Sequence, residues 1–324
     1  MIKSNVRVHS IFRPIFAAIT SLFAAGAVVQ PAAAVVISQT TQQMPSLATF
    51  NGKLYLAWAG TDSAHHLNVA ASTNGTTFGA PSVSSNWAAS DTGPAITAFN
   101  GKLYIVWAGG GNNLNIASSS DGVNFGNQSF VSTLTSTCTP ALAASATTLY
   151  LAYCINLENV LVTSSTDGTT WTTPVSPPGD ASHYSPAIAV FGNEVVFAFT
   201  TPPNINGAGA TVVYSAPATS PLPISTGWTY NTALGSSSGT CCGSAGLAPL
   251  NSSLYMGLFN SAEVPFVYNF ETSSNGLLAV VSDQTIPGTV NSATNPALAV
   301  FNGHLYFAFK GTDNPAHLNI VEVF

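Results

Sequence analysis

Two segments of this chain each carry an aspartate four residues before a histidine. They are TDSAHHLN at 61–68 and TDNPAHLN at 312–319. At this spacing the carboxylate can orient a neutral imidazole toward a polyol ligand or toward a divalent metal. Alternatively, each aspartate caps its own turn and each histidine packs against a strand edge. The pattern makes Asp62, His66, Asp313 and His317 candidate functional residues.

The segments that must position these loops repeat along the chain. Residues 94–132 contain four short apolar or alternating runs, separated by Asn100-Gly101, by a Gly/Asn cluster at 109–113 and by Asp121-Gly122. Asn-Gly between such runs favours a type I′ hairpin. Equivalent positions recur 46 to 59 residues apart, at Tyr55, Tyr104, Tyr150, Val196, Tyr255 and Tyr306. A repeat of this kind is typical of a propeller blade, and a solenoid or a pair of sandwiches is the alternative.

The sequence therefore predicts an all-β, six-bladed β-propeller with four-stranded antiparallel blades. The sixth copy lacks a fourth strand, because the chain ends just after its third run at 317–323. A spare β-branched run at 35–37 precedes the first blade. We expect this N-terminal strand to close the last blade, so that no sheet edge stays open.

The first 34 residues have the pattern of a secretory signal peptide. Lys3, Arg7 and Arg13 precede an apolar run at 15–29 and the small residues Ala32, Ala33 and Ala34. We expect domains at 1–34 (signal peptide) and 35–324 (propeller), and a secreted protein, either extracellular or periplasmic. An uncleaved anchor is the alternative.

Charge is scarce in this chain, since only 6% of residues are Asp, Glu, Lys or Arg. After residue 34 only Lys53, Lys102 and Lys310 face twelve acidic residues. This balance provides no basic surface for nucleic acid or acidic lipid. We expect a monomer without cofactor or metal, and no membrane insertion after signal cleavage.

Three turns share a local motif, which is clearest at 165–171 (STDGTTW) and recurs at 119–125 (SSDGVNF) and 72–78 (STNGTTF). The Asp or Asn can bond its own turn, the glycine takes positive φ, and the aromatic packs beneath. These turns resemble the Asp-box (BNR) repeats of sialidase-like propellers, although here glycine directly follows the Asp. The resemblance implies a relative of the sialidases outside their catalytic core.

Sialidase activity itself is not expected. The resemblance implies an arginine triad that clamps the substrate carboxylate, and a tyrosine nucleophile with acidic partners. Lysine performs such a bidentate role poorly. The last arginine of this chain is Arg13, inside the predicted signal peptide.

Strand parity predicts one face where ligand-binding loops gather. The loops between second and third strands, and those from each fourth strand to the next blade, return to the same face. The candidates placed there are Asp62, His65, His66, Trp87, Asp91, Asn112, Asn113, Glu158, Asp180, His183, Tyr184, Glu263, Lys310, Asp313 and His317. Exposure alone also explains polar residues in loops.

The four cysteines suggest two disulfides in an exported protein. Cys138 precedes the first strand of blade three and Cys154 follows its second strand, so these two can be bridged. Cys241 and Cys242 are adjacent, and we expect a vicinal bond between them, although four cysteines allow three pairings.

Three functional hypotheses follow. The leading one is a secreted, non-enzymatic, lectin-like propeller that binds glycans through its loop face, with Trp87 and Tyr184 stacking on sugars. The alternative is a glycoside hydrolase or lyase that uses the loop carboxylates. A protein-binding scaffold or adhesion propeller is the third.

Overall fold

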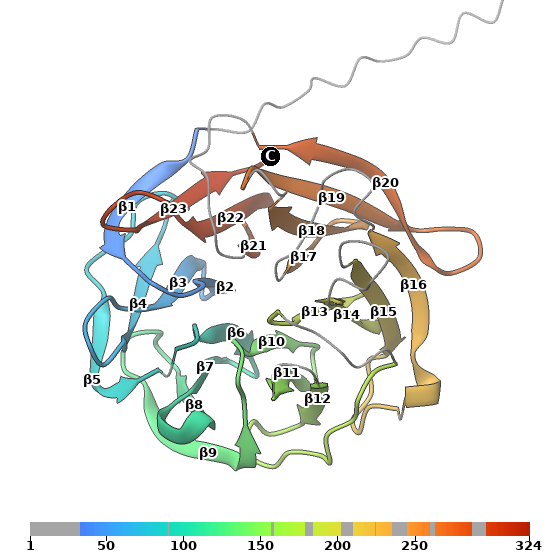
Figure 1. Cartoon of the computed structure of the whole chain (residues 1–324), viewed down its shortest axis with the longest axis horizontal. Coiled ribbons are helices and arrows are strands. Elements are labelled where there is room, and N and C mark those ends of the chain that lie inside the picture. Colours follow the sequence, from blue (N-terminus) through green and yellow to red (C-terminus); the bar gives the residue numbers. More distant parts are fainter. Residues whose placement is uncertain are drawn as a thin grey trace, which may run out of the picture.

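Six antiparallel sheets surround a central axis in this computed structural model (Figure 1). The structure describes residues 33–89, 91–156, 159–178, 184–201, 210–223, 225–234, 245–259, 263–286 and 296–324. Within these ranges no helix is long and apolar enough to cross a membrane. The prediction of an all-β six-bladed propeller is confirmed.

Each blade follows the chain outward from the axis. Blade one contains β2 (Ser46–Phe50), β3 (Lys53–Ala59), β4 (His66–Ser72) and β5 (Ser82–Ala88). Blade two contains β6 (Ala95–Phe99), β7 (Lys102–Ala108), β8 (Asn113–Ser119) and β9 (Gly126–Thr135), and blade three β10 (Ala141–Ala144), β11 (Leu149–Ile155) and β12 (Asn159–Ser165). Blade four contains β13 (Ala187–Phe191), β14 (Glu194–Thr200), β15 (Thr211–Pro217) and β16 (Thr229–Leu234). Blade five contains β17 (Gly246–Leu250), β18 (Ser253–Phe259), β19 (Pro265–Thr272) and β20 (Leu278–Thr285).

Blade six joins the two ends of the described chain. It contains β21 (Ala297–Phe301), β22 (His304–Lys310), β23 (His317–Glu322) and, outermost, β1 (Val35–Thr40). β1 pairs antiparallel with β23, with Val35 opposite Ile320 and Thr40 opposite His317. Figure 1 shows the blue β1 beside the red β23. The N-terminal strand therefore occupies the place predicted for it.

The inner hairpins turn at the expected Asn-Gly pairs. Asn51-Gly52, Asn100-Gly101 and Asn302-Gly303 all have positive φ at both residues, from 46° to 83°. This is the conformation that a type I′ turn requires. The sequence signal for these hairpins reflects backbone geometry.

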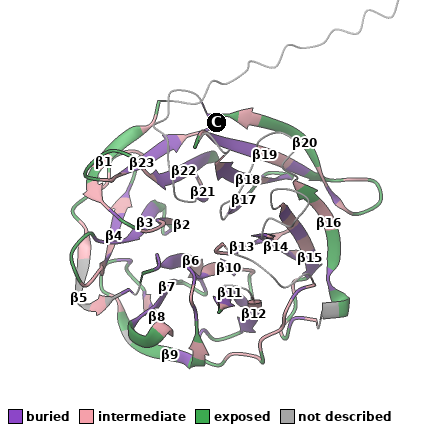
Figure 2. Ribbon diagram, in the orientation of Figure 1, coloured by how far each residue is buried: buried purple, intermediate pink, exposed green. Residues whose placement is uncertain are grey.

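The second strands form the centre of each interface between blades. Along β3, every residue from Leu54 to Ala59 is buried, and β7 and β11 show the same pattern. Large aromatics fill this layer, including Trp58 and Trp107. Figure 2 shows the burial decreasing from the inner strands toward the outer strands such as β9, β16 and β20. Burial on both faces explains why these strands lack alternation of apolar and polar residues.

Blade three departs from the prediction of four strands. Its sheet has three strands, and only an isolated bridge between Val162 and Val175 lies outside β12. Pro174, Pro177 and Pro178 follow in the sequence. Proline has no N–H to donate to a ladder, which prevents a regular strand here.

Candidate active site

The loops that follow β3 and β22 lie on one face of the disc, which we call the loop face. They connect second to third strands in neighbouring blades, and the connection from β1 to β2 reaches the same face. The loop after β7, at 109–112, lies there too. Both aspartate–histidine motifs are therefore on this face, on either side of the junction between blades six and one.

Asp62 caps its own loop and orients the neighbouring imidazole. Its Oδ1 accepts the Ala64 N–H at 3.1 Å and lies 2.7 Å from His66 Nδ1, while its Oδ2 accepts the His66 N–H at 3.2 Å. The loop is closed by a bond from Gly60 N–H to the His66 carbonyl at 2.9 Å. Gly60 leaves room for this arrangement, because a Cβ there would lie 2.8 Å from Asp62 Oδ2.

Asp313 repeats this arrangement in blade six. Its Oδ1 accepts the His317 N–H at 3.1 Å and its Oδ2 bonds His317 Nδ1. Gly311 N–H donates to the His317 carbonyl at 2.8 Å, and Asn319 Nδ2 reaches the same carbonyl at 3.1 Å. The shared residues of TD-x-x-x-HLN thus produce the same loop twice.

Hydrogen bonding keeps both carboxyl groups ionised. For Asp62, burial raises the pKa, but the bonds from Ala64 and His66 outweigh it and leave the pKa below its ordinary value. For Asp313, the His317 side chain is the main cause of a lowered pKa. The Asp and His side chains of both pairs are between 29% and 44% exposed, so solvent and ligands can reach them.

Each aspartate therefore caps its turn and also bonds the ring of its histidine, while a ligand or metal at that ring stays a prediction. With Nδ1 bonded to the carboxylate, the Nε2 atom is the part of each ring left for a ligand. Among the residues that the structure describes, neither His66 Nε2 nor His317 Nε2 has a hydrogen-bond partner. Within the same residues, no three His, Cys, Asp or Glu side chains form a group that could hold a metal ion.

The connection from β1 to β2 joins the two loops. Thr41 N–H donates to the Ala316 carbonyl at 3.1 Å in the blade six loop. On the other side, Thr40 Oγ1 lies 3.0 Å from Thr61 Oγ1 in the blade one loop. Lys310 Nζ donates to the Gln42 carbonyl at 3.4 Å. We call this group the seam site; it comprises residues 40–43, Asp62, His66, Lys310, Asp313 and His317.

Sequence reasoning identified the charged members of the seam site but missed residues 40–43. Their only signal was the polar run TTQQ between a strand and the first blade. A second missed pair lies on the opposite face, where His304 Nδ1 is 2.9 Å from Glu322 Oε1. Nothing in the spacing of these two residues suggested that they meet.

The other predicted residues are spread around the loop face. His65 Nδ1 lies 3.8 Å from Asp91, whose side chain is 97% exposed. Asn112 has a φ of 62° in its turn, and Asn113 Nδ2 donates to the Gly110 carbonyl at 2.9 Å. Glu263 is exposed with a φ of 61°. Glu158, Asp180 and His183 lie outside the described residues.

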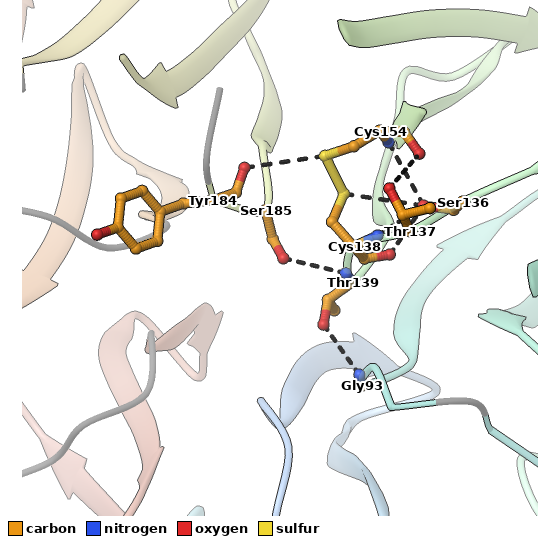
Figure 3. Close-up of a disulfide and its surroundings, with 8 residues drawn as sticks. All are labelled: Gly93, Ser136, Thr137, Cys138, Thr139, Cys154, Tyr184 and Ser185. Carbon is orange, nitrogen blue, oxygen red and sulfur yellow. Dashed lines mark hydrogen bonds between the residues drawn. A yellow bond between two sulfur atoms is a disulfide. The ribbon is translucent and has the colours of Figure 1, made fainter. Parts of the chain in front are cut away.

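The two aromatic candidates, Trp87 and Tyr184, lie in different surroundings. Trp87 is half-buried, and its ring stacks on Trp107 at 5.1 Å between centroids, with the Phe125 ring at its edge. One face of the indole is therefore occupied by the core. Tyr184 lies beside the disulfide of blade three, with its carbonyl oxygen 3.8 Å from Cys154 Sγ (Figure 3).

The predicted disulfide between Cys138 and Cys154 is present, with Cα atoms 5.5 Å apart. It is next to a chain of bonds between blades: Thr139 N–H donates to Ser185 Oγ at 3.0 Å, and Gly93 N–H donates to Thr139 Oγ1 at 2.9 Å (Figure 3). The bridge thus anchors blade three where three blades meet. Cys241 and Cys242 lie outside the described residues.

A cavity of about 90 Å³ lies where the inner strands of all six blades begin. Ligand pockets for small molecules are typically about 300–1,000 Å³. The described residues that line it include prolines, aliphatic side chains, Ser46 and Thr139, and none of these described residues has an ionisable side chain.

A tyrosine–carboxylate pair exists on the opposite face. Tyr306 Oη donates to Glu322 Oε2 at 2.9 Å. Burial, followed by the Glu322 carboxylate, raises the pKa of Tyr306 to about 12. This tyrosine packs between blades and is a poor nucleophile.

Comparison with known proteins finds relatives by fold only. No family model matches the chain, and no curated protein matches it. A solved endosialidase of phage phi92 superposes with a TM-score of 0.60 at 12% identity, over 91% of this chain and 69% of that one. The Trypanosoma rangeli sialidase in complex with the inhibitor DANA gives a TM-score of 0.59 at 12% identity, over 90% and 58% of the two chains. An α-L-arabinofuranosidase of Clostridium thermocellum gives 0.49 at 13% identity, over 78% of this chain and 96% of that one.

This chain has the six-bladed propeller fold that solved sialidases have. The two solved proteins with TM-scores of 0.60 and 0.59 are named as an endosialidase and a sialidase, and this finding overturns the interpretation of the chain as a non-catalytic lectin. The composition does not distinguish a lectin from an enzyme, because loops rich in hydroxyl and amide groups can bind carbohydrate in either. We therefore set that interpretation aside.

Proposed function

We propose that this chain is a glycoside hydrolase whose proton-transfer groups are the two aspartate–histidine pairs of the seam site. The observation that supports it most is that two neighbouring blades present the same pair on the same face, in loops that bond to Thr40 and Thr41 through Thr61 and Ala316. The enzymes that share the fold at TM-scores of 0.60 and 0.59 add support.

Hydrolysis of a glycosidic bond needs one group to give a proton and one to take it. In the proposed mechanism the neutral imidazole of one pair takes a proton from water as the oxygen attacks the anomeric carbon. The imidazolium of the other pair donates a proton to the leaving oxygen as the carbon–oxygen bond breaks. Asp62 and Asp313 keep the proton on Nδ1, so that Nε2 of His66 and His317 faces the substrate.

Sialidase chemistry of the arginine-clamped kind is not part of this proposal. No arginine follows Arg13 in the sequence. The turns at 119–125 and 165–171, which resemble Asp boxes in sequence, lie on the opposite face, and we infer a folding role for them. Asp121 Oδ1, for example, accepts the N–H groups of Val123 and Asn124, both at 2.8 Å.

Export to an oxidising compartment remains part of the proposal. The bond between Cys138 and Cys154 fits such a compartment, and it accords with the signal peptide predicted for residues 1–34. A glycan outside the cell is the partner that this location and fold suggest.

The test is a screen of plant, fungal and bacterial polysaccharides for release of new reducing ends. We expect wild-type protein to cleave at least one, and H66A and H317A each to reduce the rate at least about 100-fold, the scale of one general acid–base group. H304A is the matched control, since it removes the histidine of the pair with Glu322 on the opposite face. Equal losses in all three variants, or no cleavage of any glycan, would exclude this function.

A further inference from the structure

Blade two repeats the loop closure of the seam site without its acid–base groups. Gly109 N–H donates to the Asn113 carbonyl at 2.9 Å, and Asn115 Nδ2 donates to the same carbonyl at 2.8 Å. A glycine N–H and an asparagine amide bond the carbonyls of His66 and His317 in the same way. This closure therefore presents a histidine in blades one and six and an asparagine in blade two, whose loop sequence GGGN contains no carboxylate.

The Asn113 side chain points toward blade one. Asn115, two residues along β8, pairs with Trp107, and Trp107 packs into the hydrophobic cluster that blades one and two share. Residues two apart on a strand point to the same side of the sheet. Asn113 is half-buried, and its Nδ2 donates to the Gly110 carbonyl at 2.9 Å. The described chain gives this side chain no other hydrogen bond, so its oxygen and one amide proton remain for a ligand.

An exposed aromatic ring lies on the same side of blade two. Phe130 on β9 is opposite Asn115, which is opposite Trp107 on β7. Directly opposite residues share a face of the sheet, so Phe130 also points toward blade one. Trp107 is 1% exposed, whereas Phe130 is 64% exposed, the largest fraction among the described large apolar side chains. The equivalent positions in blades one and six are valines, Val83 and Val36, so an aromatic here distinguishes blade two.

Blade one provides the other side of this junction. The Trp87 ring stacks on Trp107 at 5.1 Å between centroids and so covers the inner end of the row that Phe130 ends. Trp87 and Trp107 are the last residues but one of β5 and β7, so both lie near the loop face. His65 Nδ1, in the loop that carries His66, lies 3.8 Å from Asp91 at the start of blade two. This loop therefore reaches both the seam site and the junction of blades one and two.

We propose that this junction binds a sugar unit of the glycan that is cleaved at the seam site, with Phe130 stacking on the sugar and Asn113 bonding its hydroxyl groups. This inference rests on the proposed hydrolase function for the identity of the glycan. The two sites lie in adjacent junctions with blade one between them, so the substrate is a chain of several sugar units. We call this group the junction subsite; it comprises His65, Trp87, Asp91, Asn113 and Phe130.

The junction subsite favours a neutral sugar. Asp91 is its one carboxylate, and its five residues include no lysine or arginine. Lys53 and Lys102 begin β3 and β7 at the opposite face. A sugar carboxylate at this subsite is repelled by Asp91 and meets no fixed positive charge. The C–H face of a neutral sugar instead contacts the Phe130 ring, and its hydroxyl groups suit an amide that both donates and accepts.

The experiment measures binding of neutral oligosaccharides by calorimetry. The probes are cello-, xylo-, manno- and arabino-oligosaccharides, from disaccharide to hexasaccharide, with oligogalacturonates as the acidic counterparts. In the series that wild-type protein binds, we expect F130A and N113A each to bind the hexasaccharide about five- to tenfold more weakly, the scale of one aromatic contact or one hydrogen bond. F130L, which keeps an apolar side chain without a flat ring, should be as weak as F130A. Y230A is the matched control, since it removes a ring of blade four that is 50% exposed.

Cleavage assays on the same oligosaccharides give a second readout. The ratio of kcat/KM for the hexasaccharide to kcat/KM for the disaccharide should fall about five- to tenfold in F130A and in N113A, because only the longer chain reaches the junction subsite. Y230A should keep the wild-type ratio. Melting temperatures of all variants show that each is folded.

The outcomes separate the junction subsite from the proposed function. A wild-type ratio in F130A and N113A, with cleavage still dependent on His66 and His317, would overturn the subsite and leave the hydrolase intact. Binding that depends on Phe130 without cleavage of any glycan would leave the subsite as a binding site and exclude the hydrolase. The subsite is also overturned if F130A loses no more affinity than Y230A, if oligogalacturonate binds as tightly as the neutral chains, or if no oligosaccharide binds.

Discussion

The phenol ring of Tyr55 in blade one lies against Gly122 in the turn of blade two. A Cβ at Gly122 would be 2.2 Å from Tyr55 Oη, and the φ of this glycine is +74°. The same contact joins Tyr104 to Gly168 and Tyr306 to Gly75. Each of these turns therefore needs glycine for two reasons, its backbone conformation and the tyrosine of the preceding blade.

This double requirement predicts an unequal cost for two glycine substitutions. Gly101 has a similar φ of +70°, but a Cβ there meets nothing within 4 Å. We expect G101A to cost about 1 kcal/mol from backbone strain, and G122A to cost about 1–3 kcal/mol more because of the clash. Urea unfolding of both variants measures the difference. Equal costs would mean that Tyr55 moves aside freely.

The bridge between Cys138 and Cys154 predicts a second stability effect. It closes a short loop, with a sequence separation of 16. Restricting the unfolded chain over such a loop stabilises the fold by about 3 kcal/mol. We expect the C138S/C154S variant to lose roughly that amount in denaturant unfolding. The stability of the C138S/C154S variant should be the same in oxidising conditions and in mild reductant. A wild-type protein whose stability does not change in reductant would contradict a contribution of about 3 kcal/mol.

The repeated turns make stability depend on pH in the acid range. The Asn124 N–H is the main cause of a lowered pKa for Asp121, and the Thr170 N–H has the same effect on Asp167. A carboxyl with a lowered folded pKa contributes stability above its unfolded pKa of about 3.9 and loses it as pH falls through the folded value. The melting temperature should therefore fall progressively below about pH 4.

Asn74 gives the control for this pH effect. Its Oδ1 accepts the Thr77 N–H at 2.8 Å in the equivalent turn of blade one, without a titratable group. The D121N/D167N variant should keep the turns and show a shallower decline below about pH 4 than wild type. If the stability of this variant declines below about pH 4 as steeply as that of wild type, other carboxylates cause the decline.

Much of the fold was predictable because its signals are local. The Asn-Gly pairs determine hairpins through positive φ, as Asn51, Asn100 and Asn302 show, and the repeat of these hairpins predicts the blades. The missing fourth strand of blade three was not predicted, although Pro174 and Pro177 were visible. A proline prevents a strand only where its missing N–H would have paired with the neighbouring strand, and the pairing register that decides this is not visible in the sequence.

The candidate site was predictable only in part. The i,i+4 spacing correctly placed Asp62 beside His66 and Asp313 beside His317, since both members lie in one loop. The bonds from Thr40 and Thr41 to these loops depend on ring closure between distant segments. Trp87 was expected to stack on a sugar, and the structure places Trp107 of the next blade against one face of its ring. Contacts across blades have no local sequence signal.

The last prediction concerns the atom that Asp62 presents to His66. Asp62 Oδ1 both accepts the Ala64 N–H and faces His66 Nδ1. In D62N the side-chain oxygen at the Oδ2 position can still accept the His66 N–H, while an amide nitrogen at the Oδ1 position loses the Ala64 bond and donates to His66 Nδ1. The imidazole would then carry its proton on Nε2 and could not act as a base there. We expect the loop to stay folded and kcat to fall by about 10³- to 10⁴-fold, as for the orienting aspartate of a catalytic triad. D121N, a matched change in a turn on the opposite face, should leave kcat unchanged. An NMR spectrum of labelled histidine would show the tautomer directly, and a D62N enzyme with full activity and proton on Nδ1 would remove Asp62 from the mechanism.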